Sequence, residues 1–195
     1  MPAFWNFVTD FGDSAVTLPL ALLILAFLAA RAPRLAACWM LTIAACAGAI
    51  AALKLVFGAC GAPLAMPIVS PSGHTAMSTA VYGMLALLAG SQLSPLPRRA
   101  VYAGAGIAIL GIALSRVILH DHTPSEIALG FVVGAGAVAA FRTLLRHDAP
   151  PALPVKSLLL GSAGIVALLH GSRWVFEPAV HRLAGELRFV LPWCR

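Results

Sequence analysis

Six long apolar stretches, each with few charged residues, constrain this chain more than any other feature. A helix needs roughly 20 apolar residues to cross a hydrocarbon core of about 30 Å, and these stretches approach that length. A soluble protein of this size needs more polar surface than this chain offers, since the chain is 61% hydrophobic and only 10% charged. We therefore predict an integral membrane protein. The stretches are about Val16–Ala30, Leu35–Phe57, Thr75–Leu93, Val101–Leu119, Ile127–Leu145 and Ser157–Phe176.

The segment before the first stretch has a different composition. Residues 4–14 mix aromatic side chains with Asp10 and Asp13, which is typical of a helix at the membrane surface. The segment lacks the basic start of a cleavable signal, so we expect the first stretch to be retained. The predicted fold class is all-α, a bundle of six transmembrane helices with a short N-terminal interfacial helix. It forms a single domain over residues 1–195.

Basic residues indicate how the bundle is oriented. Seven of the thirteen Lys and Arg residues fall in loops that join alternate stretches, and such loops usually face the cytoplasm. The opposite, outer face then receives the N-terminus, loops 58–74 and 120–126, and an extracytoplasmic tail over residues 177–195. Arginines at helix ends explain the net charge of +6, and no basic cluster with interleaved aromatics suggests a nucleic-acid partner. The seven are Arg31, Arg34, Arg98, Arg99, Arg142, Arg146 and Lys156.

The four cysteines do not have the spacing of a metal site. Cys38 and Cys46 lie inside an apolar stretch, where cysteine behaves as a small hydrophobic residue. Cys60 and Cys194 fall on the same predicted outer face, where an oxidising compartment permits a disulfide. Whether these two pair stays open at this point.

Two polar loops on the outer face lead directly into apolar stretches. One ends with Ser70–His74 and the other with Thr123–Glu126, and each passes through a Ser/Thr-Pro step. We predict that Ser70 is the N-cap of the first of these helices and Thr123 that of the second, each with the following proline at the first helical position. Glu126 would complete a capping box with Thr123. Capping alone accounts for each loop, while two helix N-termini on one face would also favour an anion.

Four ionisable side chains border the same helix ends. Lys54 and Arg116 lie toward the outer ends of apolar stretches, where a charge is costly unless it serves a site or extends to the surface. His74 and His122 lie beside them. Two cations and two imidazoles together with two helix N-termini indicate a phosphate-binding pocket. His120 and Asp121, next to His122, are interpreted as part of a solvated polar loop.

This arrangement resembles the type 2 phosphatidic acid phosphatase family, the membrane lipid phosphatases related to vanadium haloperoxidases. The family pattern is KxxxxxxRP, then PSGH, then SRxxxxxHxxxD. Residues 71–74 read PSGH, and Arg116 and His122 have the spacing of the third motif. Glu126 stands where the family has aspartate. The resemblance covers about residues 15–175.

The first motif is incomplete. Lys54 matches its lysine, but Gly61 stands where the family has arginine. Arginine binds phosphate oxygens with two parallel hydrogen bonds, which lysine cannot imitate. Either the pocket works with one cation fewer, or an arginine from elsewhere supplies the charge, with Arg173 and Arg182 as candidates.

The resemblance implies a role for each matched residue. His122 would attack phosphorus and form a phosphohistidine, Glu126 would orient its imidazole, and His74 would protonate the leaving oxygen. The resemblance also implies catalysis without a metal or other cofactor. The residues expected to hold the phosphoryl oxygens are Lys54, Ser72, Gly73 and Arg116.

The function implied is that of a bacterial-type inner-membrane phosphatase with its site facing the periplasm or outside. Its substrate would be a lipid phosphate or pyrophosphate, with undecaprenyl pyrophosphate as the first candidate. Phosphatidic acid, phosphatidylglycerol phosphate and lipid A phosphate stay open. The alternatives are a non-catalytic relative that binds lipid phosphates and a lipid phosphotransferase. A transporter or channel is disfavoured, because charges occur only near the ends of the stretches. The expected partners are the substrate and the bilayer, with no obligatory protein partner.

Overall fold

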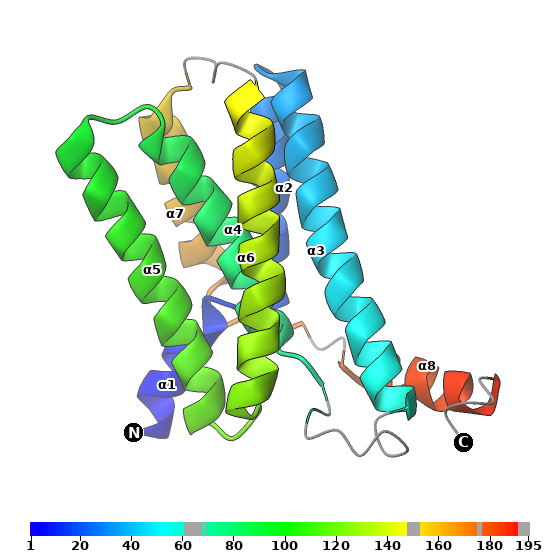
Figure 1. Cartoon of the computed structure of the whole chain (residues 1–195). Helices are drawn as coiled ribbons and strands as arrows, with labels where there is room; N and C mark the ends of the chain where they lie inside the picture. Colours follow the sequence, from blue (N-terminus) through cyan, green and yellow to red (C-terminus); the bar gives the residue numbers. More distant parts are fainter. Residues whose placement is uncertain (61–67, 69, 148–152, 175–176, 191–195) are drawn as a thin grey trace.

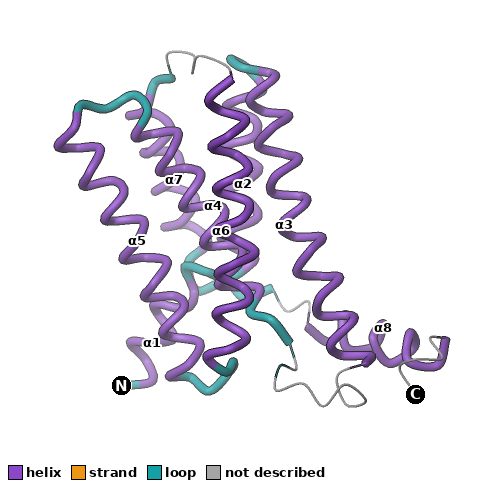
Figure 2. The backbone as a smooth tube through the Cα atoms, viewed as in Figure 1, coloured by secondary structure: helices purple, strands orange, loops and turns teal. Residues whose placement is uncertain are grey.

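The computed structural model describes residues 1–60, 68, 70–147, 153–174 and 177–190. Every regular element in these residues is a helix (Figures 1 and 2). The predicted all-α class is therefore confirmed. The helices are α1 (Pro2–Asp10), α2 (Ser14–Ala29), α3 (Pro33–Cys60), α4 (Gly73–Gly90), α5 (Pro95–Ile118), α6 (Pro124–His147), α7 (Val155–Leu169) and α8 (Glu177–Val190).

Each of the six predicted apolar stretches overlaps one helix, from α2 to α7. The last prediction was too long, because α7 ends at Leu169 and not at Phe176. His170 leaves the helical conformation, and Gly171 follows with φ of 85°, a left-handed conformation that glycine adopts without steric cost. An apolar run can continue past such a break, so hydropathy alone did not locate the helix end.

Four helical segments of the described residues are long and apolar enough to cross a membrane, and α7 is a shorter apolar helix. These segments identify an integral membrane protein by length and composition. They are Pro2–Ala29, Pro33–Cys60, Pro95–Ile118 and Pro124–Leu145. The first of them includes α1, so the predicted interfacial segment is a helix that continues into α2 after a short break at residues 11–13.

Helix α4 is not among these four, and its position in the bundle explains why. It packs against α2, α3, α5 and α6, and most of its residues are buried. Neighbouring helices shield it, so its first turns can carry hydroxyl groups that lipid-facing helices avoid. Ser78 and Thr79 both donate hydrogen bonds to the carbonyl oxygen of Thr75, at 3.3 Å and 2.6 Å.

Helices α4 and α6 approach each other closely at two glycines. A Cβ atom on Gly130 would lie 2.5 Å from the carbonyl oxygen of Ser72, and one on Gly134 would lie 2.5 Å from that of Ala76. Both distances are too short for any side chain. This small-xxx-small spacing is typical of membrane helices, whose association depends on close packing. The approach places the N-termini of the two helices side by side.

The bundle has two different ends (Figure 1). The N-terminus, α1, the start of α4, the α5–α6 turn and α8 lie at one end, and the α2–α3 and α4–α5 turns lie at the other. Arg31, Arg34, Arg98 and Arg99 belong to the second end. The predicted separation of the candidate site from these basic loops is therefore present in the fold.

The predicted tail contains a helix. Helix α8 runs crosswise to α3 at the end of the bundle that carries the N-terminus (Figure 1). Its buried Ala184 would contact a Cβ atom on Gly58 at 3.0 Å, and Leu187 packs against Ala59 and Cys60. Cys60 is disulfide-bonded. Its predicted partner, Cys194, lies outside the described residues.

Candidate active site

A cavity of about 660 Å³ opens at the end of the bundle where α1 and α8 lie. Its walls come from α1, α2, α3, α4, the α5–α6 turn, the α7–α8 linker and α8. Five of the seven predicted site residues line it: Lys54, Gly73, His74, Arg116 and His122. The other two, Ser72 and Glu126, are buried: Glu126 contacts His122, and Ser72 accepts the Thr75 N–H at the start of α4.

Glu126 holds His122. The Nδ1 atom of His122 lies 3.1 Å from Glu126 Oε2, and the side chains of both residues are at most 10% exposed. The same Oε2 accepts the Thr123 N–H at 3.0 Å, while the Glu126 N–H donates to Thr123 Oγ1 at 3.4 Å. The capping box predicted for α6 is therefore present. The carboxylate caps the helix and contacts the imidazole at the same time.

The pKa of His122 is lowered from its ordinary value. Burial is the largest cause, and the positive charges of Arg116 and Lys54 add to it, whereas the hydrogen bond to Glu126 opposes it. The imidazole is therefore neutral at neutral pH. With Nδ1–H donating to the carboxylate, a tautomer assigned from this partner, Nε2 carries the lone pair that a nucleophile needs.

The N-terminus of α4 differs from the prediction. Ser72 is the N-cap, since its Oγ accepts the Thr75 N–H at 3.3 Å, and the helix begins at Gly73. The predicted cap at Ser70, with Pro71 in the helix, is wrong. Glu126 explains the shift, because its Oε1 accepts the Ser70 N–H at 2.8 Å and its carbonyl oxygen accepts the Ser72 N–H at 3.1 Å.

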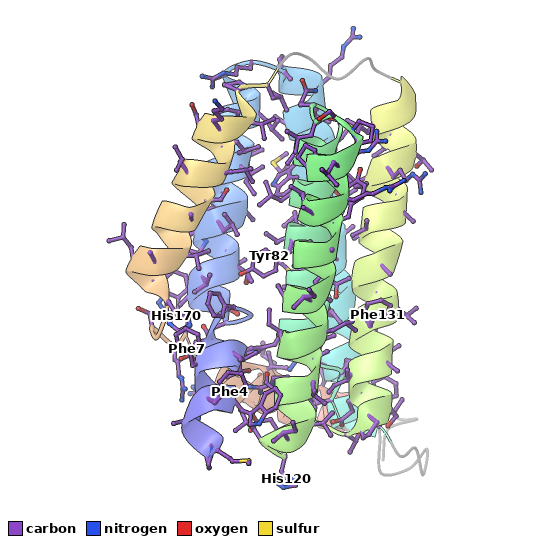
Figure 3. All side chains as sticks on the ribbon, turned by 90° about the vertical axis from the view of Figure 1, so that its left-hand side faces the viewer. Phe4, Phe7, Tyr82, His120, Phe131 and His170 are labelled. Atoms are coloured by element: carbon purple, nitrogen blue, oxygen red, sulfur yellow. The ribbon has the colours of Figure 1, made fainter. Side chains whose placement is uncertain are left out.

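Arg116 lies at the C-terminal end of α5 and contacts two elements. Its Nη1 donates to Asp121 Oδ2 at 2.9 Å and to Thr9 Oγ1 at 3.1 Å. Asp121 was interpreted only as a solvated loop residue. Its side chain is 43% exposed, but it pairs with Arg116 and lines the cavity. His120 is solvated as predicted and points away from the end of α5 (Figure 3), in a left-handed conformation with φ of 60°.

His74 contacts a carboxylate that sequence reasoning did not connect with the site. Its Nε2 lies 3.5 Å from Asp13 Oδ2. Asp13 is buried at the N-cap of α2, where Oδ1 accepts the Ala15 N–H at 2.8 Å. The same Oδ1 accepts the Trp174 N–H at 3.1 Å. Asp13 therefore joins the start of α2, the start of α4 and the α7–α8 linker.

Arg173 is a further cation of the cavity. Its Nε donates to Asp10 Oδ1 at 3.0 Å and its Nη2 donates to Asn6 Oδ1 at 3.3 Å. Its side chain is 53% exposed, and it lines the same cavity as Lys54. Arg182, the other candidate for the missing arginine, is exposed on α8 and does not line the cavity.

Comparison with known proteins identifies the segment that contains the second and third motifs. Residues 63–148 match the family model of the PAP2 superfamily. The segment is similar to the PAP2 superfamily, in agreement with the family predicted from the motifs. The match supports a phosphatase-type activity.

A second likeness extends beyond the PAP2 segment. The chain is 28% identical over 168 residues to an "Uncharacterized 22.5 kDa protein in cps region" of Klebsiella pneumoniae. The alignment covers 85% of this chain and 78% of the relative. No solved structure gives a significant match.

Four charged cavity residues lie outside the PAP2 segment, namely Asp10, Asp13, Lys54 and Arg173. They come from the α1–α2 junction, from α3 and from the linker after α7. Aromatic packing positions the start of that linker. The His170 ring lies 4.4 Å, between centroids, from the rings of both Phe7 and Phe11 (Figure 3). Elements before and after the PAP2 segment thus complete its cavity.

Proposed function

We propose that this protein is a membrane lipid phosphatase that works through a phosphohistidine at His122. The observation that carries the proposal is the His122–Glu126 pair at a cavity that also contains Lys54 and Arg116. A buried neutral imidazole is a nucleophile, and the carboxylate on Nδ1 stabilises the positive charge that develops during attack. Two cations beside it supply the charge that a phosphoryl group requires.

The proposed reaction has two steps. His122 Nε2 attacks phosphorus in line with the bond to the leaving oxygen, a P–N bond forms, and the P–O bond breaks while His74 protonates that oxygen. Water then attacks phosphorus, His74 takes its proton, and the P–N bond breaks, which releases inorganic phosphate and restores neutral His122. Lys54, Arg116 and the Gly73 N–H hold the phosphoryl oxygens in both steps. The first N–H groups of a helix have no partner within the helix, so that of Gly73 is available.

The form of the cavity favours a lipid substrate. One part of its wall is charged, and another is apolar and comes from α2, α3 and α4. A phosphate bound beside His122 would leave the attached tail against this apolar wall. The substrate proposed first is undecaprenyl pyrophosphate, with phosphatidic acid, phosphatidylglycerol phosphate and lipid A phosphate as alternatives. The apolar cavity residues of α2, α3 and α4 are Leu18, Ala47, Ile50, Ala51 and Met77.

We also propose that α2 to α7 all span the inner membrane and that the cavity faces the periplasm or outside. The basic α2–α3 and α4–α5 turns lie at the opposite end, which the positive-inside rule assigns to the cytoplasm. The disulfide at Cys60 supports this orientation, because α3 ends there at the cavity side and structural disulfides persist in oxidising compartments.

Arg173 is proposed to replace the family arginine that is missing at Gly61. Asp10 and Asn6 bind its Nε and Nη2 and hold the guanidinium at the cavity. The Nη1 atom and the second hydrogen on Nη2 remain for phosphate oxygens. Arg182 lies outside the cavity and is the natural control, so Arg173→Gln should raise KM more than Arg182→Gln does.

Phosphate release from purified protein in detergent tests the proposal. The substrates are the four lipid phosphates named above, each assayed with and without excess chelator. His122→Ala should abolish release while leaving the thermal unfolding midpoint unchanged, and Arg98→Gln at the opposite end should match the parent protein. Protein quenched in alkaline detergent should carry label from a lipid with a radiolabelled phosphate, because a phosphohistidine survives alkali but not acid, and His122→Ala should carry none.

The other outcomes separate the alternatives. Near-normal activity of His122→Ala would refute the assignment of the nucleophile. Phosphate binding with no release and no labelled protein would identify a non-catalytic relative. Labelled protein that gives up its phosphoryl group only to a second lipid would identify a phosphotransferase. A strict metal requirement would contradict the proposed chemistry.

A further inference from the structure

We propose that Asp13 is a positioning residue for His74, which it holds in the orientation that protonates the leaving oxygen. This inference rests on the proposed phosphatase function. Asp13 lies outside the PAP2 segment and outside all three motifs. It would give the cavity a second carboxylate–imidazole pair, besides Glu126 and His122.

Capping does not account for the whole Asp13 side chain. Oδ1 alone accepts the Ala15 N–H of the α2 cap and the Trp174 N–H. Oδ2 points instead to His74 Nε2, at 3.5 Å. The side chain is only 9% exposed, so this second oxygen is directed at the imidazole in a largely buried setting. A buried carboxylate oxygen requires a partner, and His74 is the one that faces it.

Gly12 allows the backbone before Asp13 to approach His74. A Cβ atom on Gly12 would lie 2.5 Å from Ile112 Cγ2 of α5 and 3.5 Å from His74 Cβ. Only glycine allows the chain to pass this near to α5 and the histidine. The junction of α1 and α2 is therefore wedged between α5 and α4, and Asp13 follows immediately. Its position beside His74 is fixed by packing as well as by hydrogen bonds.

Asp10, the neighbouring carboxylate of the cavity, has a different partner. Its Oδ1 accepts the Nε–H of Arg173 at 3.0 Å. Asp121 pairs with Arg116. Among the described cavity carboxylates, Asp13 is thus the one that contacts His74.

The proton path follows from this geometry. Asp13 stays ionised and accepts the Nε2–H of His74, which leaves Nδ1–H to give its proton to the bridging oxygen as the P–O bond breaks. The carboxylate also stabilises the imidazolium that must exist before this transfer. The separation of 3.5 Å is long for a hydrogen bond, and we expect it to shorten when His74 is protonated with substrate bound.

The test compares two leaving groups in Asp13→Asn. Asparagine is as good an N-cap as aspartate, so the α2 cap is kept while the charge is removed. Dodecyl phosphate releases an alkoxide that needs a proton, whereas 4-dodecyl-2-nitrophenyl phosphate, also a monoester, releases a nitrophenolate that does not. We expect kcat for dodecyl phosphate to fall about 30-fold, less than the 10²–10⁴-fold that general acid catalysis contributes, because His74 itself is retained. KM and kcat for the nitrophenyl ester should change less than about 3-fold.

Further variants make the test decisive. In a His74→Ala background, Asp13→Asn should have almost no additional effect, because the pair acts as a unit. Asp13→Ser keeps a good capping residue without an oxygen that reaches His74, and it should reproduce the loss. Glu186→Gln, an exposed carboxylate change on α8, should behave like the parent protein.

Failure of the inference is distinguishable from failure of the proposed function. If the parent protein releases no phosphate from either ester, the proposed function is wrong. If the parent is active and Asp13→Asn is equally active on both esters, the inference is overturned. Equal losses on both esters, or a lower unfolding midpoint in Asp13→Asn and Asp13→Ser alike, would reduce Asp13 to a helix cap.

Discussion

The N-termini of α4 and α6 lie side by side, but they are capped in different ways. Helix α6 is capped locally by Thr123 and Glu126, three residues apart. Helix α4 has a local cap in Ser72, yet the chain leading into it is held by α6, because Glu126 accepts the N–H groups of both Ser70 and Ser72. One start is encoded in four consecutive residues, and the other needs a distant helix.

This difference explains which prediction succeeded. The capping box of α6 is visible in sequence because all its partners are neighbours. At α4 two serines were available, and the choice between them depends on a glutamate that is distant in sequence. Glu126 therefore serves three groups at once: its own helix, the start of α4 and the imidazole of His122. Changes at Glu126 should affect both regions, while changes at Thr123 should affect only one.

Glu126→Gln should give the largest effect. Glutamine keeps an oxygen for one backbone N–H but loses the charge that stabilises the developing imidazolium of His122. We expect kcat to fall about 100-fold, less than the loss for an orienting aspartate in a serine-protease triad. The measurement is phosphate release in detergent with Glu186→Gln as control. A loss as large as that of His122→Ala would mean that Glu126 is needed mainly to build the pocket.

Gly130→Ala should separate the two helices. Its Cβ atom would lie 2.5 Å from the carbonyl oxygen of Ser72, so α4 and α6 must move apart. We expect a destabilisation of about 1–3 kcal/mol, the usual range for overpacking, together with a loss of activity. Gly136→Ala on the same helix meets nothing within 4 Å and is the matched control. Thermal unfolding midpoints in detergent measure both, and equal midpoints would contradict the close approach.

The pH dependence of the rate should move in opposite directions in two variants. The pKa of His122 is lowered, so the nucleophile is lost only when pH falls through that lowered value. Lys54→Met removes a cation that lowers this pKa, so the acid limb should shift upward, by about one pH unit or less. Glu126→Gln removes the group that raises the pKa, so the limb should shift downward. Shifts of the same sign in kcat/KM profiles would refute this account.

Thr123→Ala should have the smallest effect. It removes the Oγ1 acceptor of the α6 cap, which is worth about 1 kcal/mol at a typical N-cap. Glu126 still holds His122 and α4, so activity should change less than about 3-fold. Thermal unfolding and phosphate release on one preparation measure both quantities. An activity loss close to that of Glu126→Gln would show that the two helix starts are not independent.

The sequence predicted the helices and the motif residues but not the contacts that complete the site. Long apolar runs located the ends of α2 to α6 to within six residues, since a helix in lipid must satisfy its own backbone. The contact between Asp13 and His74 depends on Gly12 fitting against α5, which no local pattern reveals. Helix α8 was missed because its polar sequence is typical of a surface tail, and only packing on α3 makes it an element of the fold.

The hydrogen bond from the Trp174 N–H to Asp13 joins residues 161 positions apart, and this has a consequence for how the protein is made. A ribosome delivers both motif histidines and Glu126 to the membrane well before it synthesises Trp174. For part of its synthesis the chain therefore contains the motif residues but lacks the linker that lines the cavity with Arg173 and Trp174. Activity should therefore arise only after α7 and the linker that follows it have been synthesised. A chain terminated before Arg173 is expected to be inactive.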